Sequence, residues 1–253
     1  MIESLPALAF HAVLVLARIG GALLLLPGLG APEVPATIRL ALVLALTALL
    51  LPVVQPGLPA LPGEVPALLR LLLLETMAGI WLGLLARLIE LALAQAGQVM
   101  ALMVGLASPL QTDPAIGAQG TALSRLFGLA ATVLVLATGL YGVPLRALAE
   151  SYAVMPPGVP LALPAQSAAV AQAVADSLSL ALRLAAPLVL ASVLGQFALG
   201  LLARLAPQVP VFMVVAPGQI LAGLLLVALL LPALLGTWLT AARDGFAGLP
   251  GLP

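Results

Sequence analysis

Long apolar runs, separated by short stretches rich in proline and glycine, alternate along the whole chain. A helix needs ~20 consecutive apolar residues to cross the hydrocarbon core of a bilayer. Two of the runs are much longer than one crossing, and the others are close to that length. The pattern predicts an all-α integral membrane protein with about six hydrophobic helical segments. These are Leu5–Pro27, Ala36–Val54, Pro66–Ala107, Ala122–Tyr141, Ala165–Ala206 and Val211–Leu239.

The breaks between the runs indicate how the chain is divided. Gly28–Pro35 is dense in helix breakers and predicts a tight turn, and the proline series over Gln55–Gly63 predicts a rigid linker. A second proline-rich connection follows at 155–164. We therefore expect an N-terminal helical part over 1–154, a C-terminal helical hairpin over 165–240 and a loose tail over 241–253.

One central stretch, Gly105–Arg125 (GLASPLQTDPAIGAQGTALSR), differs from everything around it. Glycines and prolines make a regular helix unfavourable here, and Asp113 is its one carboxylate. Backbone that is not helical is tolerated at membrane depth only where it is buried in protein or lines a water-filled cavity. We interpret the segment as the working part of a passage and the other runs as its helical frame. The alternative is a plain loop between helices.

Composition supports a membrane protein and narrows the possible partners. The chain is 63% hydrophobic and only 7% charged, whereas soluble domains are about 45–50% apolar and about 25% charged. Basic and acidic residues cancel to a net charge of zero, which gives no reason to expect nucleic-acid binding. The first residues include Glu3 and no basic residue, so we expect the first apolar run to stay in the mature protein rather than serve as a cleaved signal.

Several charged residues lie inside the apolar runs, where a charge is costly unless it faces a bundle interior or a cavity. Arg87 and Glu90 are three residues apart and are predicted to pair on one helix face. Arg70 and Glu75 are five apart, which predicts partners on other helices. Because the signs balance and no acidic cluster is present, structural pairing is favoured over ion translocation. Arg18 in the first run is also assigned to helix or subunit packing.

Small residues recur at helical spacing, at Gly79 with Gly83 and at Gly195 with Gly200. Such pairs allow helix backbones to approach closely, so all four are predicted to be packing positions.

No arrangement of residues predicts catalysis. The chain has one histidine, His11, and no cysteine, which excludes a multi-histidine metal site and any disulfide. The sequence contains no P-loop, GxSxG or HExxH motif. We therefore expect a protein that is not an enzyme and needs neither a cofactor nor a metal.

Four stretches of the chain form an ordered set of motifs. The first is Ala17–Ala45 (ARIGGALLLLPGLGAPEVPATIRLALVLA), and the last is Gly200–Phe212 (GLLARLAPQVPVF), which has the spacing G-L-x-x-R-x-A-P-Q-x-x-x-F. These two resemble the N-terminal signature and the C-terminal pattern of the FliR family of flagellar biosynthetic proteins. Ala96–Gly97, then Gly105–Leu106 and Asp113–Pro114, resemble the central pattern, and Tyr152 with Met155–Gly158 a later aromatic and proline–glycine turn. The ordered set covers nearly the whole chain. The related SctT-type virulence secretion component shares the fold, and the N-terminal signature favours the flagellar branch.

The resemblance implies a multi-pass subunit of the type III export gate in the bacterial inner membrane, within the flagellar basal body. Family members assemble with FliP-like and FliQ-like subunits and an FlhB-like subunit, and exported flagellar proteins pass through. Membrane lipids are further expected contacts. The N-terminal part of the family is FliP-like and its C-terminal hairpin FliQ-like, with kinked helical hairpins instead of simple spans.

The resemblance also implies particular site residues. The family's central loop plugs the closed pore, which assigns that role here to 105–124; this sequence lacks the bulky aromatic residues that often follow the Gly105–Leu106 position. The residues expected to shape the plug are Gly105, Leu106, Pro109, Asp113, Pro114, Gly117 and Gly120. Those expected to form helix and subunit contacts, besides Arg18, Arg87 and Glu90, are Arg39, Arg204, Pro207, Gln208 and Phe212.

A second hypothesis, from another class, is a small-solute secondary transporter. Such proteins often carry broken helices at corresponding positions in two repeats. Here one glycine- and proline-interrupted segment stands between unlike halves, which favours the export-gate interpretation.

Overall fold

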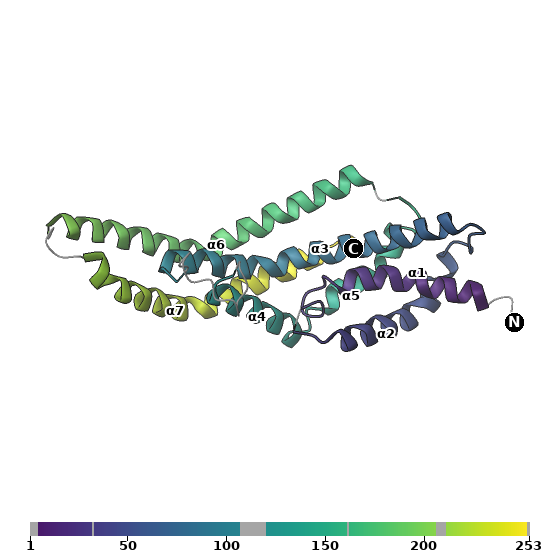
Figure 1. Cartoon of the computed structure of the whole chain (residues 1–253), viewed down its shortest axis with the longest axis horizontal. Coiled ribbons are helices and arrows are strands. Elements are labelled where there is room, and N and C mark those ends of the chain that lie inside the picture. The colour runs from purple at the N-terminus through teal and green to yellow at the C-terminus, as the bar shows by residue number, and fades with distance from the viewer. Residues whose placement is uncertain (1–4, 32, 107–119, 161, 206–210, 252–253) are drawn as a thin grey trace. The chain divides into compact units, whose positions relative to one another are not determined.

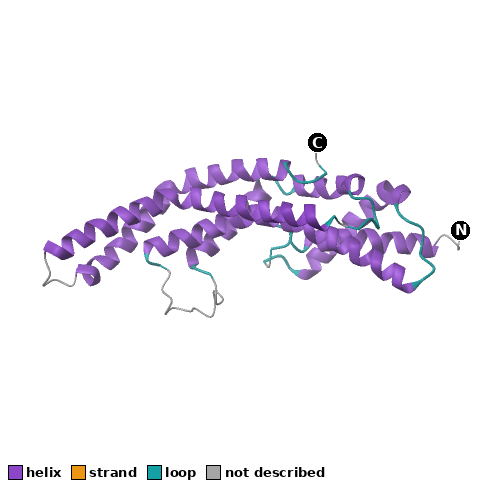
Figure 2. Cartoon of the chain, turned by 90° about the horizontal axis from the view of Figure 1, so that it is seen from above, coloured by secondary structure: helices purple, strands orange, loops and turns teal. Residues whose placement is uncertain are grey.

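The computed structural model describes residues 5–31, 33–106, 120–160, 162–205 and 211–251, apart from the side chains of 211–214 and 216. Helices make up most of this part of the chain, and it contains no strand (Figures 1 and 2). In order they are α1 (Leu5–Leu23), α2 (Ala36–Val54) with the short 3-10 helix η2 (Gln55–Gly57), α3 (Val65–Val104), α4 (Ala122–Ala137), α5 (Gly142–Val154), α6 (Leu163–Leu205) and α7 (Val211–Ala247).

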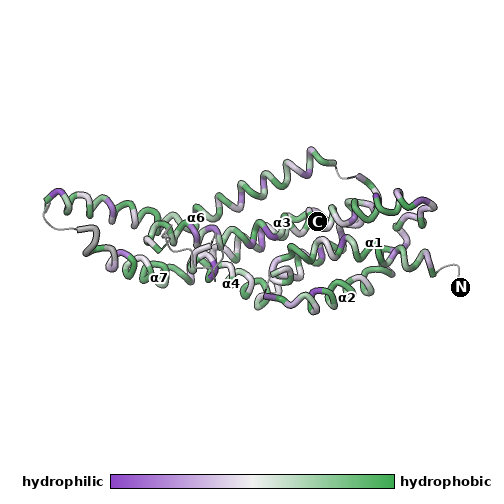
Figure 3. The backbone as a smooth tube through the Cα atoms, viewed as in Figure 1, coloured by the Kyte–Doolittle hydropathy of each residue, from purple (hydrophilic) through white to green (hydrophobic). Residues whose placement is uncertain are grey.

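Five of the helices are long and apolar enough to cross a membrane: α1, α2 with η2, α3, α6, and α7 from Pro217 onward. The pair α4 and α5 passes the same test as a sixth span that is bent by 71° at its break. Green, hydrophobic positions run along every helix in Figure 3, with isolated purple ones between them. The prediction of an all-α protein with about six hydrophobic segments is confirmed.

Three predicted helix ends differ from the structure by four residues or more. Helix α1 ends at Leu23, before the predicted Pro27. The helix that begins at Ala122 ends at Ala137, because Gly139 adopts a left-handed φ of 70° and a new helix starts at Gly142. At the other end of the chain, α7 continues to Ala247 through the segment predicted as a loose tail. Ala241 and Ala242 favour helix, and Phe246 is fully buried, so this segment has apolar surface to bury.

The helices form two compact units that are interleaved along the sequence. The first comprises 1–89, 132–174 and 243–253, and the second 90–131 and 175–242. Helix α3 contributes to both. The division into parts at 155–164 that the sequence predicts is not tested by this grouping.

Each unit has its own apolar core. In the first, residues of α1, α2, α3 and α5 form one buried cluster, which includes Val15, Ile19, Val43, Leu82 and Leu148. In the second, the buried positions come from the C-terminal part of α3 and from α4, α6 and α7, among them Leu93, Phe127, Leu184 and Trp238. Phe127 and Trp238 are completely buried.

Candidate functional site

A buried ion pair joins α1 to α3 in the first unit. Arg18 and Glu75 are 1% and 2% exposed, and the Arg18 Nε lies 2.7 Å from the Glu75 Oε2. The Arg18 Nη2 donates a second hydrogen bond, 3.1 Å long, to the Glu75 Oε1. This two-point contact uses the planar fork of the guanidinium, which matches the geometry of a carboxylate.

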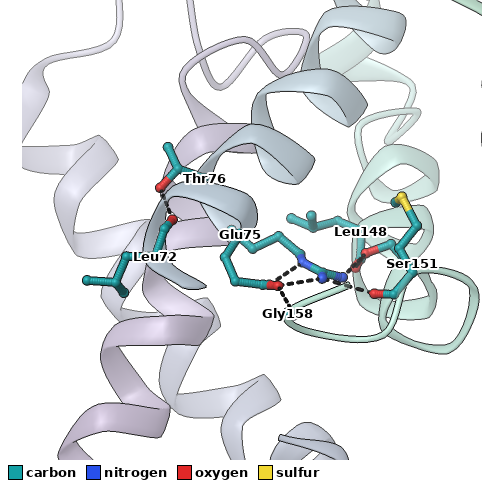
Figure 4. Close-up of polar contacts among 8 residues, drawn as sticks. Leu72, Glu75, Thr76, Leu148, Ser151 and Gly158 are labelled. Atoms are coloured by element: carbon teal, nitrogen blue, oxygen red, sulfur yellow. Dashed lines mark hydrogen bonds and ion pairs between the residues drawn. The ribbon is translucent and has the colours of Figure 1, made fainter. Parts of the chain in front are cut away.

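The rest of the guanidinium is occupied by α5 and the residue after it (Figure 4). Its Nη1 donates to the Ser151 hydroxyl at 3.3 Å and its Nη2 to the Met155 carbonyl at 3.0 Å. The ring of Tyr152 lies against the same group, with its centroid 4.1 Å from Cζ. A buried charge is tolerated when it is paired and hydrogen-bonded, and here the charge is paired and each guanidinium nitrogen donates to an acceptor.

Glu75 in turn fixes the start of the connection between α5 and α6. Its Oε1 accepts a hydrogen bond of 3.2 Å from the backbone N–H of Gly158. Gly158 has a φ of 80°, a conformation that favours glycine. We call Arg18, Glu75, Ser151, Met155 and Gly158 the Arg18 cluster. It connects α1, α3, α5 and the turn that leads to α6.

The helices that carry the pair cross at a distance that only glycine permits. A Cβ added at Gly79 would collide with the Arg18 carbonyl oxygen, and one added at Gly83 would lie 2.5 Å from the Ala22 carbonyl oxygen. From the other side, a Cβ at Gly21 would lie 2.6 Å from the Thr76 carbonyl oxygen. The prediction that Gly79 and Gly83 allow close helix approach is confirmed.

In the second unit, α3 ends immediately before the central segment with a glycine cap. The N–H of Leu106 bonds to the Ala101 carbonyl at 2.9 Å, and the N–H of Gly105 bonds to the Leu102 carbonyl at 3.3 Å. Gly105 has a φ of 83°. This is the Schellman arrangement, in which a left-handed glycine closes the helix and satisfies carbonyls that have no partner within it.

The helix after the segment begins at a polar cap that is bonded to α3. The Thr121 hydroxyl accepts the N–H of Ser124 at 3.2 Å, as an N-cap side chain does. The Oε1 of Gln98 accepts both the Thr121 N–H at 3.1 Å and the Thr121 hydroxyl at 3.0 Å. One glutamine on α3 therefore fixes the residue at which α4 starts.

Helices α3 and α4 also pack closely just below this cap. The Ser124 hydroxyl donates to the Ala94 carbonyl at 2.9 Å. A Cβ at Gly97 would lie 2.7 Å from a ring carbon of Phe127 and 2.9 Å from the Leu123 carbonyl oxygen. The segment between α3 and α4 therefore begins and ends at two helices that pack tightly against each other.

The predicted plug residues fall partly within the described chain. Gly105, Leu106 and Gly120 are exposed and border the break between α3 and α4. Pro109, Asp113, Pro114 and Gly117 lie outside the described residues.

The predicted packing residues have separate environments. Arg18 belongs to the cluster described above, whereas Arg39 donates a local hydrogen bond of 3.2 Å to the Val34 carbonyl. On α3, Glu90 is buried and Arg87 half-buried, and their pairing stays a prediction. Arg204 is exposed in the last turn of α6. Pro207, Gln208 and the side chain of Phe212 lie outside the described part of the chain.

Sequence reasoning left out several residues that the structure brings together. It predicted a partner for Glu75 on another helix but did not identify Arg18, 57 positions away along the chain. It did not assign roles to Ser151, Gln98 or Thr121. Thr121 precedes a helix-forming run, which is the usual position of an N-cap and was an available signal.

Comparison with known proteins identifies the family. The sequence profile of "Bacterial export proteins, family 1" matches residues 9–244. The chain belongs to this family, the FliR family. It is 32% identical to the flagellar biosynthetic protein FliR of Caulobacter vibrioides over 237 residues, which cover 93% of this chain and 94% of the relative.

Two further FliR relatives come from other bacteria. Identity is 30% with FliR of Aquifex aeolicus, over 90% of this chain and 88% of the relative. Identity is also 30% with FliR of Escherichia coli K12, over 81% of this chain and 78% of the relative. The FliR-family chain is thus a multi-pass membrane export protein of flagellar biosynthesis, and not an enzyme.

Proposed function

We propose that this FliR-family chain is a core subunit of the flagellar type III export gate in the bacterial inner membrane. With FliP-like and FliQ-like subunits it forms the conduit for unfolded flagellar proteins, and an FlhB-like subunit adjoins it. The conduit is passive, and the energy for export comes from elsewhere in the apparatus. Segment 105–124 contributes the plug that closes the conduit.

The observation that carries this proposal is the break in an otherwise helical frame. Helix α3 stops at Gly105 and α4 starts after Thr121, and Gln98 bonds to the residue at the second boundary. Non-helical backbone among membrane helices needs a protein-lined or wet surrounding. A conduit lumen supplies that surrounding, and the hydrogen-bonded ends of α3 and α4 hold the two boundaries of the segment in the frame.

A second line of support is the amount of apolar side chain left exposed on the long helices. Leu205, Leu225 and Leu229 are 82%, 72% and 76% exposed. Exposed apolar surface on this scale faces lipid or other membrane subunits. A subunit of a larger membrane assembly accounts for it.

Purification from detergent-solubilised membranes tests the partnership. We expect an affinity-tagged chain to copurify with several copies of other small, multi-pass membrane proteins. A chain that purifies alone, or as a small symmetric oligomer, would instead fit the secondary transporter.

Substitution in the segment tests the plug. We expect Gly117→Trp to abolish swimming or to make the membrane leaky to small ions, because a bulky side chain blocks the passage or holds it open. Gly63→Trp serves as the matched control, because a Cβ at Gly63 has no atom within 4 Å. Normal swimming and an ion-tight membrane with Gly117→Trp would remove the plug role.

A further inference from the structure

The second unit contains a partly open cavity of about 400 Å³. The end of α3 contributes Met103 and Val104 to its wall, and α6 and α7 contribute the rest. Ser192 on α6 donates a hydrogen bond of 2.8 Å to the Met103 carbonyl, and the side chain of Val104 lies where a Cβ at Gly223 of α7 would be. These contacts join α3 to α6 and to α7 at the cavity.

The wall is almost entirely apolar. Apart from Ser192 and Gln219, every residue that lines the cavity is glycine, alanine, valine, leucine or methionine. A buried water needs two to four polar partners, and an apolar cavity without them stays dry. The cavity therefore favours an apolar occupant over water.

Two glycines in the wall leave space open in the cavity. A Cβ added at Gly195 or at Gly218 would meet nothing within 4 Å, although both residues line the cavity. The absence of side chains at these two positions contributes to the open space. This contrasts with Gly223, where a Cβ would lie 2.5 Å from a methyl group of Val104.

We propose that this cavity binds one acyl chain of a membrane phospholipid. A dry apolar cavity of ~150 Å³ takes up benzene, so a cavity of about 400 Å³ holds roughly sixteen carbons at the same space per carbon, the length of a common acyl chain. The inference does not depend on the export role, since it rests on the chemistry of this cavity alone.

The surface around the cavity is apolar as well. Large apolar side chains on the outside of the same two helices are exposed, namely Val193, Leu194, Phe197, Leu221 and Leu225. The cavity therefore belongs to a surface that is suited to hydrocarbon, and the bilayer supplies acyl chains to such a surface directly. An acyl chain also needs no polar partner from the wall.

A photoreactive fatty acid tests the proposal on the full-length chain in its own membrane. Cells are fed a sixteen-carbon fatty acid that carries a diazirine in its chain, which they build into phospholipids. After irradiation the chain is purified, and the attached lipid is mapped by peptide mass spectrometry. We expect lipid adducts on the cavity residues Met103, Ala222 and Leu226.

The variant Gly195→Phe/Gly218→Phe places two rings in the open space and should abolish these adducts. The control, Gly200→Phe/Gly236→Phe, changes glycines on the same helices that also have open surroundings but do not line the cavity, and it should leave the adducts unchanged. Equal amounts of both variants in the membrane show that each one folds. Adducts that persist in the filled variant, or the absence of lipid adducts from the cavity residues of the unaltered chain, would overturn the proposal.

Discussion

The crossing of α1 with α3 and the cavity between α6 and α7 use the same sequence feature for opposite purposes. Both regions carry glycines at helical spacing. At Gly79 and Gly83 the partner backbone already occupies the space that a side chain would take. At Gly195 and Gly200 a Cβ would meet nothing within 4 Å, so the predicted close approach at these two positions is not found among the residues that the structure describes.

The comparison separates what the chain completes by itself from what it leaves open. The first region has glycine contacts and a two-point ion pair, and each nitrogen of the Arg18 guanidinium donates to an acceptor within the chain. The chain itself therefore supplies the partners of this buried charge, although the buried Tyr152 hydroxyl beside it has no hydrogen-bond partner in the described part of the chain. The second has exposed apolar side chains and an apolar cavity. Its surface becomes complete only with molecules outside the chain, which fits both a gate subunit and a lipid-binding site.

The largest effect should come from breaking the Arg18–Glu75 pair. We expect Arg18→Ala to destabilise the chain by ~3–5 kcal/mol, because it leaves the Glu75 carboxylate buried without its counter-charge. That is a large share of the ~5–15 kcal/mol by which folded domains are normally stable. The amount of full-length chain in the membrane and its thermal unfolding in detergent would both fall.

A double variant shows whether the instability comes from an unpaired buried charge or from the loss of the charges themselves. Arg18→Met/Glu75→Leu removes both charges and fills similar volume, so it should be more stable than Arg18→Ala. If the single and double variants were equally unstable, the buried pair would not be the reason for the loss. Arg70→Ala is the control, because Arg70 is exposed and lies on α3, the helix that carries Glu75.

The next effect contrasts the two kinds of glycine. Gly79→Val should prevent α1 and α3 from packing, because the new side chain meets the backbone of α1, and backbone cannot move aside without separating the helices. Gly195→Val adds the same atoms in open space and should change stability by less than ~0.5 kcal/mol. Thermal unfolding of the two variants in the same detergent measures the difference, and similar losses would contradict the comparison.

A smaller effect is expected at the cap that borders the central segment. Gln98→Leu leaves the Thr121 N–H and hydroxyl without their acceptor, at a cost of about 1–3 kcal/mol. The chain should still fold, while small-ion leakage through the membrane rises because the start of α4 is no longer held. Gln55→Leu, at an exposed glutamine in η2, is the matched control. Unchanged leakage with Gln98→Leu would show that this anchor does not affect closure.

Much of the frame could be predicted from sequence because the signals are local. Apolar runs and proline-rich breaks fixed the helices to within a few residues, and α3 ends close to where Gly105 predicts. The run that begins at Ala122 was predicted to continue to Tyr141, because the helix breakers Gly142 and Pro144 follow it, whereas α4 already ends at Ala137, before Gly139. The helical end of α7 was missed because the burial of Phe246 depends on tertiary packing.

The site could be predicted less completely. Glu75 was expected to need a partner, but many sequence positions could have supplied it, and only the fold brings Arg18, Ser151 and Gly158 together. The difference between Gly79 and Gly195 was also not predicted, since both were assigned to helix packing, although Gly83 follows the first after four residues and Gly200 follows the second after five. Local patterns identify positions suited to close packing, and tertiary structure decides which of them are filled.

The central claim is that segment 105–124 faces the path of exported proteins, and site-directed cross-linking tests it most directly. The chain has no cysteine of its own, so Gly120→Cys introduces a single thiol at an exposed position of the segment. An export substrate with one cysteine is stalled in the gate, and disulfide formation with the chain is measured. We predict a covalent product with Gly120→Cys and none with Gly63→Cys. A stalled substrate that never reacts with Gly120→Cys would contradict the claim.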